Sequence, residues 1–362
     1  MTSERTLQSV IDSLGERGDK TALVDFDKKD RHCWSFQKLS ACARAFANGL
    51  VRQDFKRGDT IALFAENSPE WIAAALGIIR AGMVAVPLDV QLGDKTLVHI
   101  LRDSDARAVI TTQKRVERIE KLASSEKKPK LILFDADSDD ERSWERFLDN
   151  KTTELPTAGS SDEAIIFYTS GTTGPPKGVP LSHANIISQL DTAADVKILA
   201  GDDRVLLPLP LHHVYPFVIG MLVPLALGLP LVLPFSLSGQ QLLRALREGE
   251  VTTIVGVPRI YSALYSSIES KVESSGWIAR RLFSVFLAVS GFARKLDLRA
   301  GKLLFRSLHK RFGENLRLLA SGGAALEPEL ASKLEALGWQ VAIGYGLTET
   351  SPLLTLSLPG EA

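Results

Sequence analysis

The segment from Tyr168 to Gly178 gathers the side chains of this 362-residue chain that are best suited to chemistry. It reads Tyr-Thr-Ser-Gly-Thr-Thr-Gly-Pro-Pro-Lys-Gly. Hydroxyl groups alternate with glycines, and glycine permits the close approach and positive φ angles with which backbone amides surround an anion. Lys177 adds a mobile positive charge suited to a terminal phosphate. The candidate phosphate-binding residues are Thr169, Ser170, Gly171, Thr172, Thr173, Gly174 and Lys177.

The spacing of this loop excludes the phosphate loop of ordinary nucleotide hydrolases. The position of the second Walker A glycine is taken by Pro176, and the residue after the lysine is Gly178 rather than serine or threonine. A flexible Gly/Ser/Thr-rich linker is the alternative. An apolar run of strand character, 164–167, precedes the loop, however, and Ser182 can cap a helix that follows. We therefore expect a phosphate-binding loop between a strand and a helix.

The elements that must position this loop alternate in type along the first part of the chain. Alternation of strands and helices favours a mostly parallel sheet with helices on both faces, and hence an α/β fold. Residues 1–163 are expected to form a first lobe and residues 164–362 a second. The predicted strands are 22–26, 60–65, 84–87, 108–111 and 131–134, and the predicted helices are 39–51, one opened by Ser68-Pro69, 95–101 and 116–122.

Composition narrows the functional classes. Lys plus Arg and Asp plus Glu both number 43, so the net charge is zero and no overall field favours nucleic acid. The two cysteines and an N-terminal start without a basic-then-apolar signal pattern favour the cytoplasm. Residues 205–243 contain no Asp, Glu, Lys or Arg, and they are long enough to suggest a membrane span. Six prolines interrupt this stretch, so we expect a buried core segment instead.

Two later segments have the form of ligand-binding turns. A predicted strand at 316–320 leads into Ser-Gly-Gly-Ala-Ala, whose small residues Gly322, Gly323 and Ala324 allow a flat ligand to approach the backbone. A plain turn between a strand and a helix is the alternative there. A further predicted strand, 340–343, ends in Gly-Tyr-Gly-Leu-Thr-Glu.

The loop at 168–178, extended by Val-Pro-Leu-Ser-His-Ala-Asn, resembles the signature of the adenylate-forming superfamily of AMP-dependent synthetases and ligases. The segment 344–352 resembles a second motif of that superfamily and follows the first in the same order. The chain is most similar to the N-terminal domain of bacterial long-chain fatty acyl-CoA synthetases. The resemblance implies a large N-terminal domain with mostly parallel sheets, flanked by helices in two packed lobes.

The resemblance also implies roles for individual residues. His213, in the segment Leu209–Tyr215, would lie beside the carboxylate substrate and the α-phosphate, although a histidine near a core segment is more often structural. Thr348 would contact the α-phosphate, and Glu349 would hold Mg²⁺. The remaining nucleotide-binding candidates are Gly322, Gly323, Ala324, Gly344, Tyr345 and Gly346, with Tyr345 near adenine.

The implied reaction joins a carboxylic acid to the α-phosphorus of ATP and then transfers the acyl group to coenzyme A. ATP, Mg²⁺ and coenzyme A are therefore the expected ligands, and a long-chain fatty acid is the expected substrate. Two alternatives stay open. One is another ligase of the superfamily that uses an aryl acid or an acyl-carrier protein, and the other is a nucleotide-binding module without activity.

Members of the superfamily continue well beyond the second motif, through further strands to a small C-terminal lid. We therefore expect an incomplete core without the lid, with impaired turnover and with exposed surface that permits a homo-oligomer. Residues 277–311 carry nine basic residues and one acidic residue between apolar positions. Such a stretch can lie on the inner face of an anionic membrane, but a solvated pair of surface helices explains it more simply and is preferred.

Overall fold

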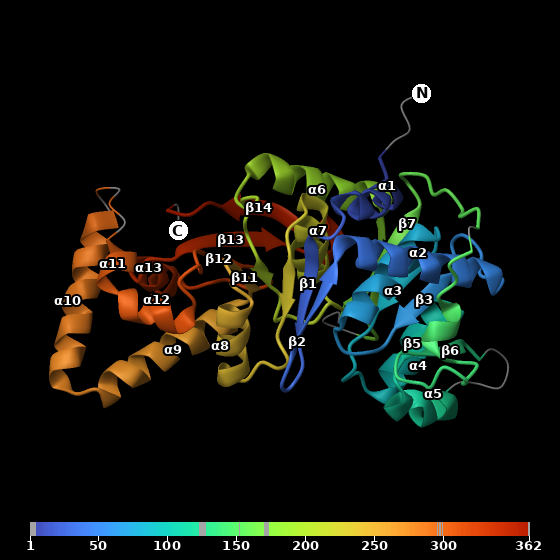
Figure 1. Cartoon of the computed structure of the whole chain (residues 1–362), viewed down its shortest axis with the longest axis horizontal. Helices are drawn as coiled ribbons and strands as arrows, with labels where there is room; N and C mark the ends of the chain where they lie inside the picture. Colours follow the sequence, from blue (N-terminus) through green and yellow to red (C-terminus); the bar gives the residue numbers. More distant parts are fainter. Residues whose placement is uncertain are drawn as a thin grey trace.

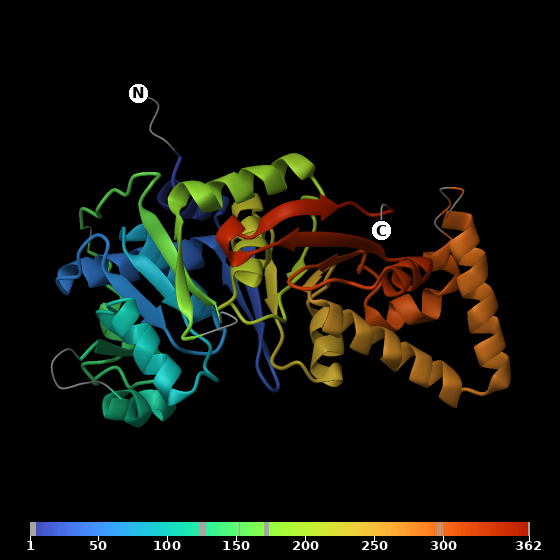
Figure 2. The same cartoon turned by 180° about the vertical axis from the view of Figure 1, so that it is seen from behind.

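The computed structural model describes residues 5–122, 128–151, 153–169, 174–294, 296, 298 and 300–360. Two β-sheets stand side by side, and helices cover their faces (Figure 1 and Figure 2). The large sheet has the order β14-β13-β12-β11-β9-β10-β1-β2, and the small sheet has the order β6-β5-β3-β4-β7-β8. The predicted α/β class with two mostly parallel sheets is confirmed.

The strands of the two sheets come from interleaved parts of the chain. Those of the large sheet are β1 (Thr21–Phe26), β2 (Arg31–Ser35), β9 (Val205–Leu206), β10 (Leu231–Leu233), β11 (Thr253–Gly256), β12 (Leu318–Ser321), β13 (Gln340–Gly346) and β14 (Leu353–Ser357). Those of the small sheet are β3 (Thr60–Leu63), β4 (Val84–Pro87), β5 (Ala108–Thr111), β6 (Lys130–Leu133), β7 (Glu163–Thr169) and β8 (Lys177–Ser182).

The helices fall into three groups by position. The central group is α1 (Leu7–Leu14), α2 (Phe36–Arg52), α3 (Pro69–Arg80), α6 (His183–Val196) and α7 (Val223–Leu227). The small sheet carries α4 (Asp94–Asp103) and α5 (Val116–Leu122) on its outer face. The outer side of the large sheet carries α8 (Gly239–Glu248), α9 (Pro258–Ser274), α10 (Trp277–Arg294), α11 (Gly301–Leu304), α12 (Arg306–Phe312) and α13 (Pro328–Ala336).

Strand alternation produces this layering, because successive side chains point to opposite faces of a sheet. Leu23 of β1 and Leu63 of β3 enter the same central core, which both sheets share. Val24, the next residue of β1, enters the core beneath α8, α9, α12 and α13. Ala62 of β3 enters the core beneath α4 and α5. The two sheets are therefore packed on a common layer of helices.

The predicted division at residue 163 does not follow the border between the sheets. β1 and β2 precede it but belong to the large sheet, whereas β7 and β8 follow it and belong to the small sheet. Each sheet is completed by a pair of strands from the other part of the chain.

Most predicted elements of the first part of the chain are confirmed, whereas α1 and several strands were not predicted. Ser68 caps α3 by accepting a hydrogen bond from the Trp71 amide at 3.1 Å. β2, β8 and β14 were not predicted, and each is an antiparallel strand at the edge of its sheet. Edge strands tolerate polar residues and proline, such as Pro180 in β8, so they lack the apolar pattern of central strands.

The uncharged stretch 205–243 forms core, as predicted. It supplies β9, β10, α7, the start of α8 and a π-helical turn, Pro216–Leu222. Phe217, Val218 and Met221 of that turn are fully buried in the central core. In the part of the chain that the structure describes, no helix combines the length and apolar character that crossing a membrane requires.

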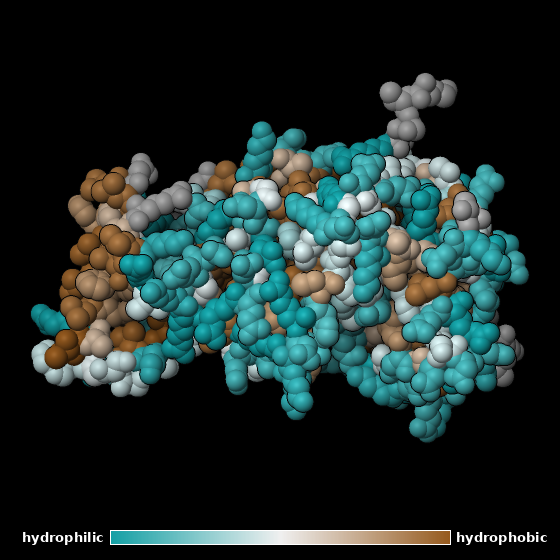
Figure 3. Space-filling view, viewed as in Figure 1, coloured by the Kyte–Doolittle hydropathy of each residue, from teal (hydrophilic) through white to brown (hydrophobic). Residues whose placement is uncertain are grey.

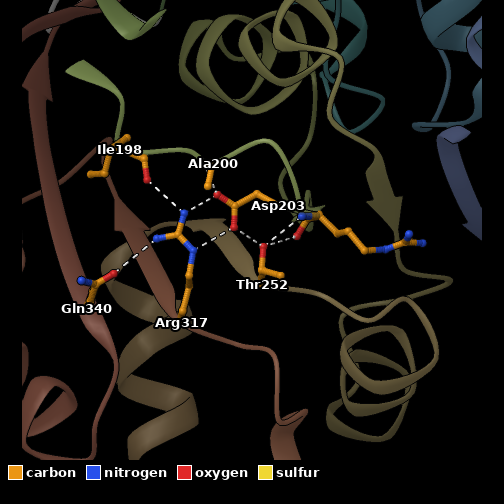
Figure 4. A network of polar contacts seen from close by, with 7 residues as sticks. Ile198, Ala200, Asp203, Thr252, Arg317 and Gln340 are labelled. Carbon is orange, nitrogen blue, oxygen red and sulfur yellow. Dashed lines mark hydrogen bonds and ion pairs between the residues drawn. The ribbon is translucent and has the colours of Figure 1, made fainter. Parts of the chain in front are cut away.

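A polar network ties together the amino ends of four strands of the large sheet (Figure 4). Asp203, which precedes β9, is almost fully buried and pairs with Arg317, which precedes β12. Asp203 also accepts hydrogen bonds from the Thr252 hydroxyl at 2.5 Å and from the Ala200 amide at 2.6 Å. Arg317 donates to the Gln340 side chain at the start of β13. The network therefore sets the stagger of the strands whose opposite ends approach the candidate site.

Candidate functional site

A cavity of about 390 Å³ brings together three segments that are far apart in the sequence. Thr169 at the end of β7, His213 in the loop after β9, and Thr348 after β13 all line it. We call it the central cavity. Parallel α/β sheets bind ligands beyond the carboxyl ends of their strands, which is where Thr169 and Thr348 lie.

The candidate phosphate loop joins two strands of a hairpin. The predicted strand before the loop and the predicted helix capped by Ser182 after it are both present, but an unpredicted strand, β8, lies between the loop and α6. Thr169 of β7 pairs with Lys177 of β8 across the hairpin, so the lysine is fixed beside the loop. Gly174 has a φ of +100°, which other residues rarely adopt. The predicted residues Ser170, Gly171, Thr172 and Thr173 lie outside the described residues.

Helix α4 holds this hairpin in place. A ring nitrogen of His99 donates a hydrogen bond to the Pro176 carbonyl at 2.9 Å, next to Lys177. The Tyr168 hydroxyl donates to the Asp103 carboxylate at 2.7 Å. Burial, reinforced by this bond, raises the pKa of Tyr168. The phenol therefore remains protonated and continues to act as a donor.

The loop that carries His213 is fixed by a single amide side chain. Asn67 donates to the Leu209 carbonyl at 2.8 Å and accepts from the Leu211 amide at 3.0 Å. These two bonds hold both ends of the segment just before the adjacent histidines. The rings of His212 and His213 stand 4.3 Å apart, measured between their centroids.

Both histidines have lowered basicity. Burial, and then repulsion from His213, lowers the pKa of His212 to about 4, and Asp89 at 3.9 Å opposes this only in part. Burial also lowers the pKa of His213, again against the attraction of Asp89. At neutral pH both rings are therefore uncharged, and they can donate or accept hydrogen bonds without repelling a second positive group.

The second motif folds back on itself next to α6. After β13 the chain forms a short turn, Thr348–Thr350, and returns as β14. Gln189 of α6 donates to the Thr350 and Leu353 carbonyls at 3.4 and 3.2 Å. It also accepts from the Leu353 amide at 3.0 Å. Gln189 thus connects the helix that follows the phosphate loop to the turn that carries Thr348.

Glycines in the second motif allow this close return. A Cβ atom at Gly346 would lie 1.6 Å from the Pro352 carbonyl oxygen, and one at Gly344 would lie 2.8 Å from the Leu353 side chain. Tyr345 between them is 60% exposed, so its ring face is accessible to a ligand. Glu349 is also exposed.

The segment after β12 packs on a tyrosine that the sequence did not single out. A Cβ atom at Gly322 would lie 2.7 Å from the Tyr215 ring, so only glycine fits there. The Tyr215 hydroxyl donates to the Ala320 carbonyl at 3.0 Å. Gly323 has a φ of +77°, and Ala324 is exposed. Small residues are therefore required at 322 and 323 by the turn itself, whether or not a ligand binds.

Among the described candidates, the central cavity gathers Thr169, His213 and Thr348 in its lining. Gly174 and Lys177 lie on the adjoining hairpin, and Glu349 lies on the same turn as Thr348. The other candidates, Gly322, Gly323, Ala324, Gly344, Tyr345 and Gly346, lie after β12 or at the end of β13 rather than in that lining.

The carboxylate of Glu349 suits the predicted Mg²⁺ as one protein ligand. The described residues contain no group of three His, Cys, Asp or Glu side chains that could hold a metal ion. Mg²⁺ commonly takes one or two carboxylates and completes its octahedron with phosphate oxygens and water. Glu349, with Asp89 in the lining of the central cavity, would supply one or two carboxylates and leave the other positions to phosphate and water.

A second, larger cavity of about 850 Å³ lies between the large sheet and helices α8 and α9. We call it the apolar cavity. Leu206, Leu243, Leu246, Ile254, Ile260 and Leu264 are among its lining residues. Leu209 and Pro210 also line it, and His212, His213 and Val214 line the central cavity. One continuous segment therefore borders both cavities.

Sequence reasoning missed the residues that hold the site together. Asn67, His99 and Gln189 act through hydrogen bonds to backbone groups that are distant in the sequence. None of them belongs to a recognisable motif. The position of Asn67 before the Ser68 cap was visible, but its bonds to the histidine segment depend on how the two sheets pack.

Comparison with known proteins places the chain in a family. The family model described as "AMP-binding enzyme" matches residues 12–362. Long chain acyl-CoA synthetase 4 of Arabidopsis thaliana is 27% identical, over 92% of this chain and 54% of its own length. Feruloyl-CoA synthase of an Amycolatopsis species is 29% identical, over 88% of this chain and 55% of its own length. The chain thus spans about half the length of these relatives.

A solved structure supports the fold independently. The N-terminal domain of FACL13 from Mycobacterium tuberculosis, determined with an inhibitor bound, superposes with a TM-score of 0.76 at 23% identity. The match covers 98% of this chain and 79% of that one. With the family model matching nearly the whole chain, these findings lead to one conclusion. The chain belongs to the family of AMP-binding enzymes.

Proposed function

We propose that this chain is the nucleotide-binding part of an AMP-forming ligase that activates a carboxylic acid and passes it to a thiol. The observation that carries this proposal is the central cavity, where Thr169, His213 and Thr348 meet. Hydroxyl groups suit phosphate oxygens, and an uncharged imidazole can approach both a phosphate and a carboxylate as a hydrogen-bond donor.

In the proposed reaction a carboxylate oxygen of the acid attacks the α-phosphorus of ATP. The bond from that phosphorus to the bridging oxygen breaks, and pyrophosphate leaves with its electron pair. The thiol of coenzyme A then attacks the acyl carbon and AMP leaves. The protein's contribution is positioning and charge stabilisation, so no covalent nucleophile is needed.

We assign Lys177 to the terminal phosphates and Thr348 to the α-phosphate. Lys177 is exposed on β8, and its backbone is paired with Thr169. The backbone position is therefore fixed, while the flexible side chain can extend its ammonium group to a phosphate. Glu349 would hold Mg²⁺, which would neutralise phosphate charge when bound. Tyr345 offers an exposed aromatic face for adenine.

We propose a long-chain fatty acid as the substrate. The apolar cavity has the volume of a typical small-molecule pocket and a mostly apolar lining, which also includes Gln240, Arg259, Ser267 and Arg311. Its wall continues from Leu209 and Pro210 to His213 in the central cavity, so an acyl chain in one cavity can present its carboxylate to the other. The similarity to feruloyl-CoA synthase supports an aryl acid as the second candidate.

The test is pyrophosphate release from Mg-ATP with a panel of fatty acids of increasing length and with ferulate. We expect release with long fatty acids, and a fall of roughly a hundredfold or more in Lys177→Ala and in Glu349→Ala. Lys28→Ala and Glu314→Ala remove the same charges at exposed positions outside the site and serve as matched controls.

Each outcome separates the candidates. Release with ferulate in preference to fatty acids would reject the fatty acid and keep the reaction. Nucleotide binding that depends on Lys177, without pyrophosphate release with any acid, would favour a nucleotide-binding module. Release that survives in both site variants would contradict the assignment of the site. Adding coenzyme A or an acyl-carrier protein to the same reaction identifies the acceptor.

A further inference from the structure

Helix α10 exposes a row of large apolar side chains at one end of the molecule. This is the brown surface at the left of Figure 3, over the helix labelled α10 in Figure 1. We call the row the α10 stripe. After its first residue it follows a spacing of four, three, four and three, which keeps side chains on one face of a helix. The stripe consists of Ile278, Leu282, Val285, Val289 and Phe292.

The exposure of the stripe is large for a protein surface. Phe292 is 65% exposed and Ile278 is 57% exposed, and Trp277 at the start of the helix is 70% exposed. Contiguous apolar surface of this kind marks a site of interaction with a protein or a membrane. The preferred sequence interpretation, a solvated pair of surface helices, does not describe this face.

The helix cannot bury the stripe by rolling over, because its other face is already packed. Phe283 and Phe286 stack edge-on against Phe305, with ring centroids 5.5 and 6.1 Å away. Arg294, at the end of α10, is paired with the nearly buried Glu335 of α13. The stripe is therefore held outward by contacts along the length of the helix.

The charges on α10 itself favour an anionic partner, whereas α9, which contacts α10, carries Glu269 and Glu273. All charged residues of α10 are basic, namely Arg280, Arg281 and Arg294, and the helix is uncharged between Leu282 and Ala293. α11, which contacts α10, adds the exposed Lys302. In a parallel pair of α10 helices from two copies of the chain, Arg280 and Arg281 would meet the same residues of the partner helix. Self-association of the stripe in that direction is thus opposed by like charges.

We propose that the α10 stripe docks on the surface of an anionic lipid bilayer. The helix is about 27 Å long at 1.5 Å per residue, and it would lie in the interface with its apolar row among the acyl chains. Arg280 and Arg281 would reach lipid phosphates, and Trp277 suits the level of the headgroups. The proposal concerns attachment to the surface, since α10 does not qualify as a membrane span.

The experiment is co-sedimentation with vesicles of phosphatidylcholine, with and without phosphatidylglycerol, at low and high salt. We expect binding to the anionic vesicles that weakens with salt. Val289→Asp should abolish it, whereas Ser284→Asp puts the same charge on an exposed position outside the stripe and should lower binding much less. Arg280→Gln and Arg281→Gln should each lower the partition coefficient roughly fivefold.

The folded state is checked in each variant by circular dichroism, and both aspartate positions are exposed, so unfolding is not expected. Absence of binding to anionic vesicles would overturn the proposal. A dimer in light scattering that Val289→Asp converts to a monomer, without vesicle binding, would instead identify the stripe as a contact between copies. Vesicle binding is measured without nucleotide or acid, so its failure is distinguishable from failure of the proposed reaction.

Discussion

At the scale of single residues, the adjacent histidines line the central cavity that we propose as a site for charged ligands, and burial keeps both rings uncharged at neutral pH. Asn67 fixes the segment that carries them through two backbone hydrogen bonds. An imidazole held in this way can donate a hydrogen bond without a change of protonation as a ligand enters.

The lowered pKa of His212 predicts that the folded protein loses stability in acid. Its ordinary pKa of 6.5 falls to about 4 in the folded state, so between these values the unfolded chain binds more protons. Stability therefore falls as the pH drops through this window. His212→Gln should reduce that fall by up to about 3 kcal/mol, since one pKa unit corresponds to about 1.4 kcal/mol.

The measurement is urea unfolding of both proteins at a series of pH values between 7 and 4. His32→Gln is the control, because the hydrogen bond to Asp27 raises the pKa of this exposed histidine. His32→Gln removes a group that stabilises the folded state at low pH, so this variant should lose more stability in acid than the unchanged protein, the opposite of His212→Gln. If the free energy of unfolding of His212→Gln fell between pH 7 and pH 4 as much as that of the unchanged protein, the prediction would be refuted.

The sequence motifs identified residues that line the central cavity, but they did not identify the residues that hold these segments in place. Thr169, His213 and Thr348 belong to motifs, and the fold brings them to one cavity. Their individual roles stay predictions. Asn67 and Gln189 could not be found in this way, because an amide that bonds to a distant carbonyl has no local pattern.

At the scale of elements, the connection between α6 and the second motif is the feature that unites the site. Replacing Gln189 by alanine removes two donated bonds and one accepted bond. We expect a loss of about 1–2 kcal/mol in the free energy of unfolding and a fall of roughly tenfold in pyrophosphate release.

Two neighbouring variants make this test specific. Ser188→Ala changes an exposed residue of the same helix and should leave both quantities unchanged. Gln189→Glu retains the acceptor for the Leu353 amide and should recover part of the stability. If the alanine variant released pyrophosphate at the normal rate, Gln189 would be irrelevant to the placement of Thr348.

The central strands of the small sheet were predicted well because burial on both faces leaves an apolar run. The predicted strand 84–87 coincides with β4, and 108–111 coincides with β5. β8 shows the limit of this signal, since its Pro180 and polar ends are permitted only at an edge. Which strands lie at an edge depends on the order of the strands in the sheet, and no short segment of sequence determines that order.

At the scale of the whole molecule, the network around Asp203 joins four neighbouring strands of the large sheet, β9, β11, β12 and β13 (Figure 4). Asp203→Asn leaves Arg317 without its carboxylate in a largely buried setting. We expect the free energy of unfolding to fall by about 2–3 kcal/mol, less than for a fully buried pair because the Arg317 side chain is 32% exposed.

Chemical denaturation of Asp203→Asn beside Asp202→Asn checks this expectation. Asp202 is the preceding residue and is exposed, so its variant loses the same charge without touching the network. Equal stability of the two variants would show that the network contributes no more than an ordinary surface charge.

The pairing of β1 with β10 also bears on how the chain reaches its folded state. Leu23 stands opposite Leu231, so that side of β1 has no neighbour until β10 has left the ribosome. The small sheet draws all of its strands from residues 60–182 and can assemble much earlier. Contacts of such long sequence separation form slowly. β1 therefore stays unpaired on that side until β10 has been made, and until then the nascent chain carries an open, apolar edge for chaperones to protect.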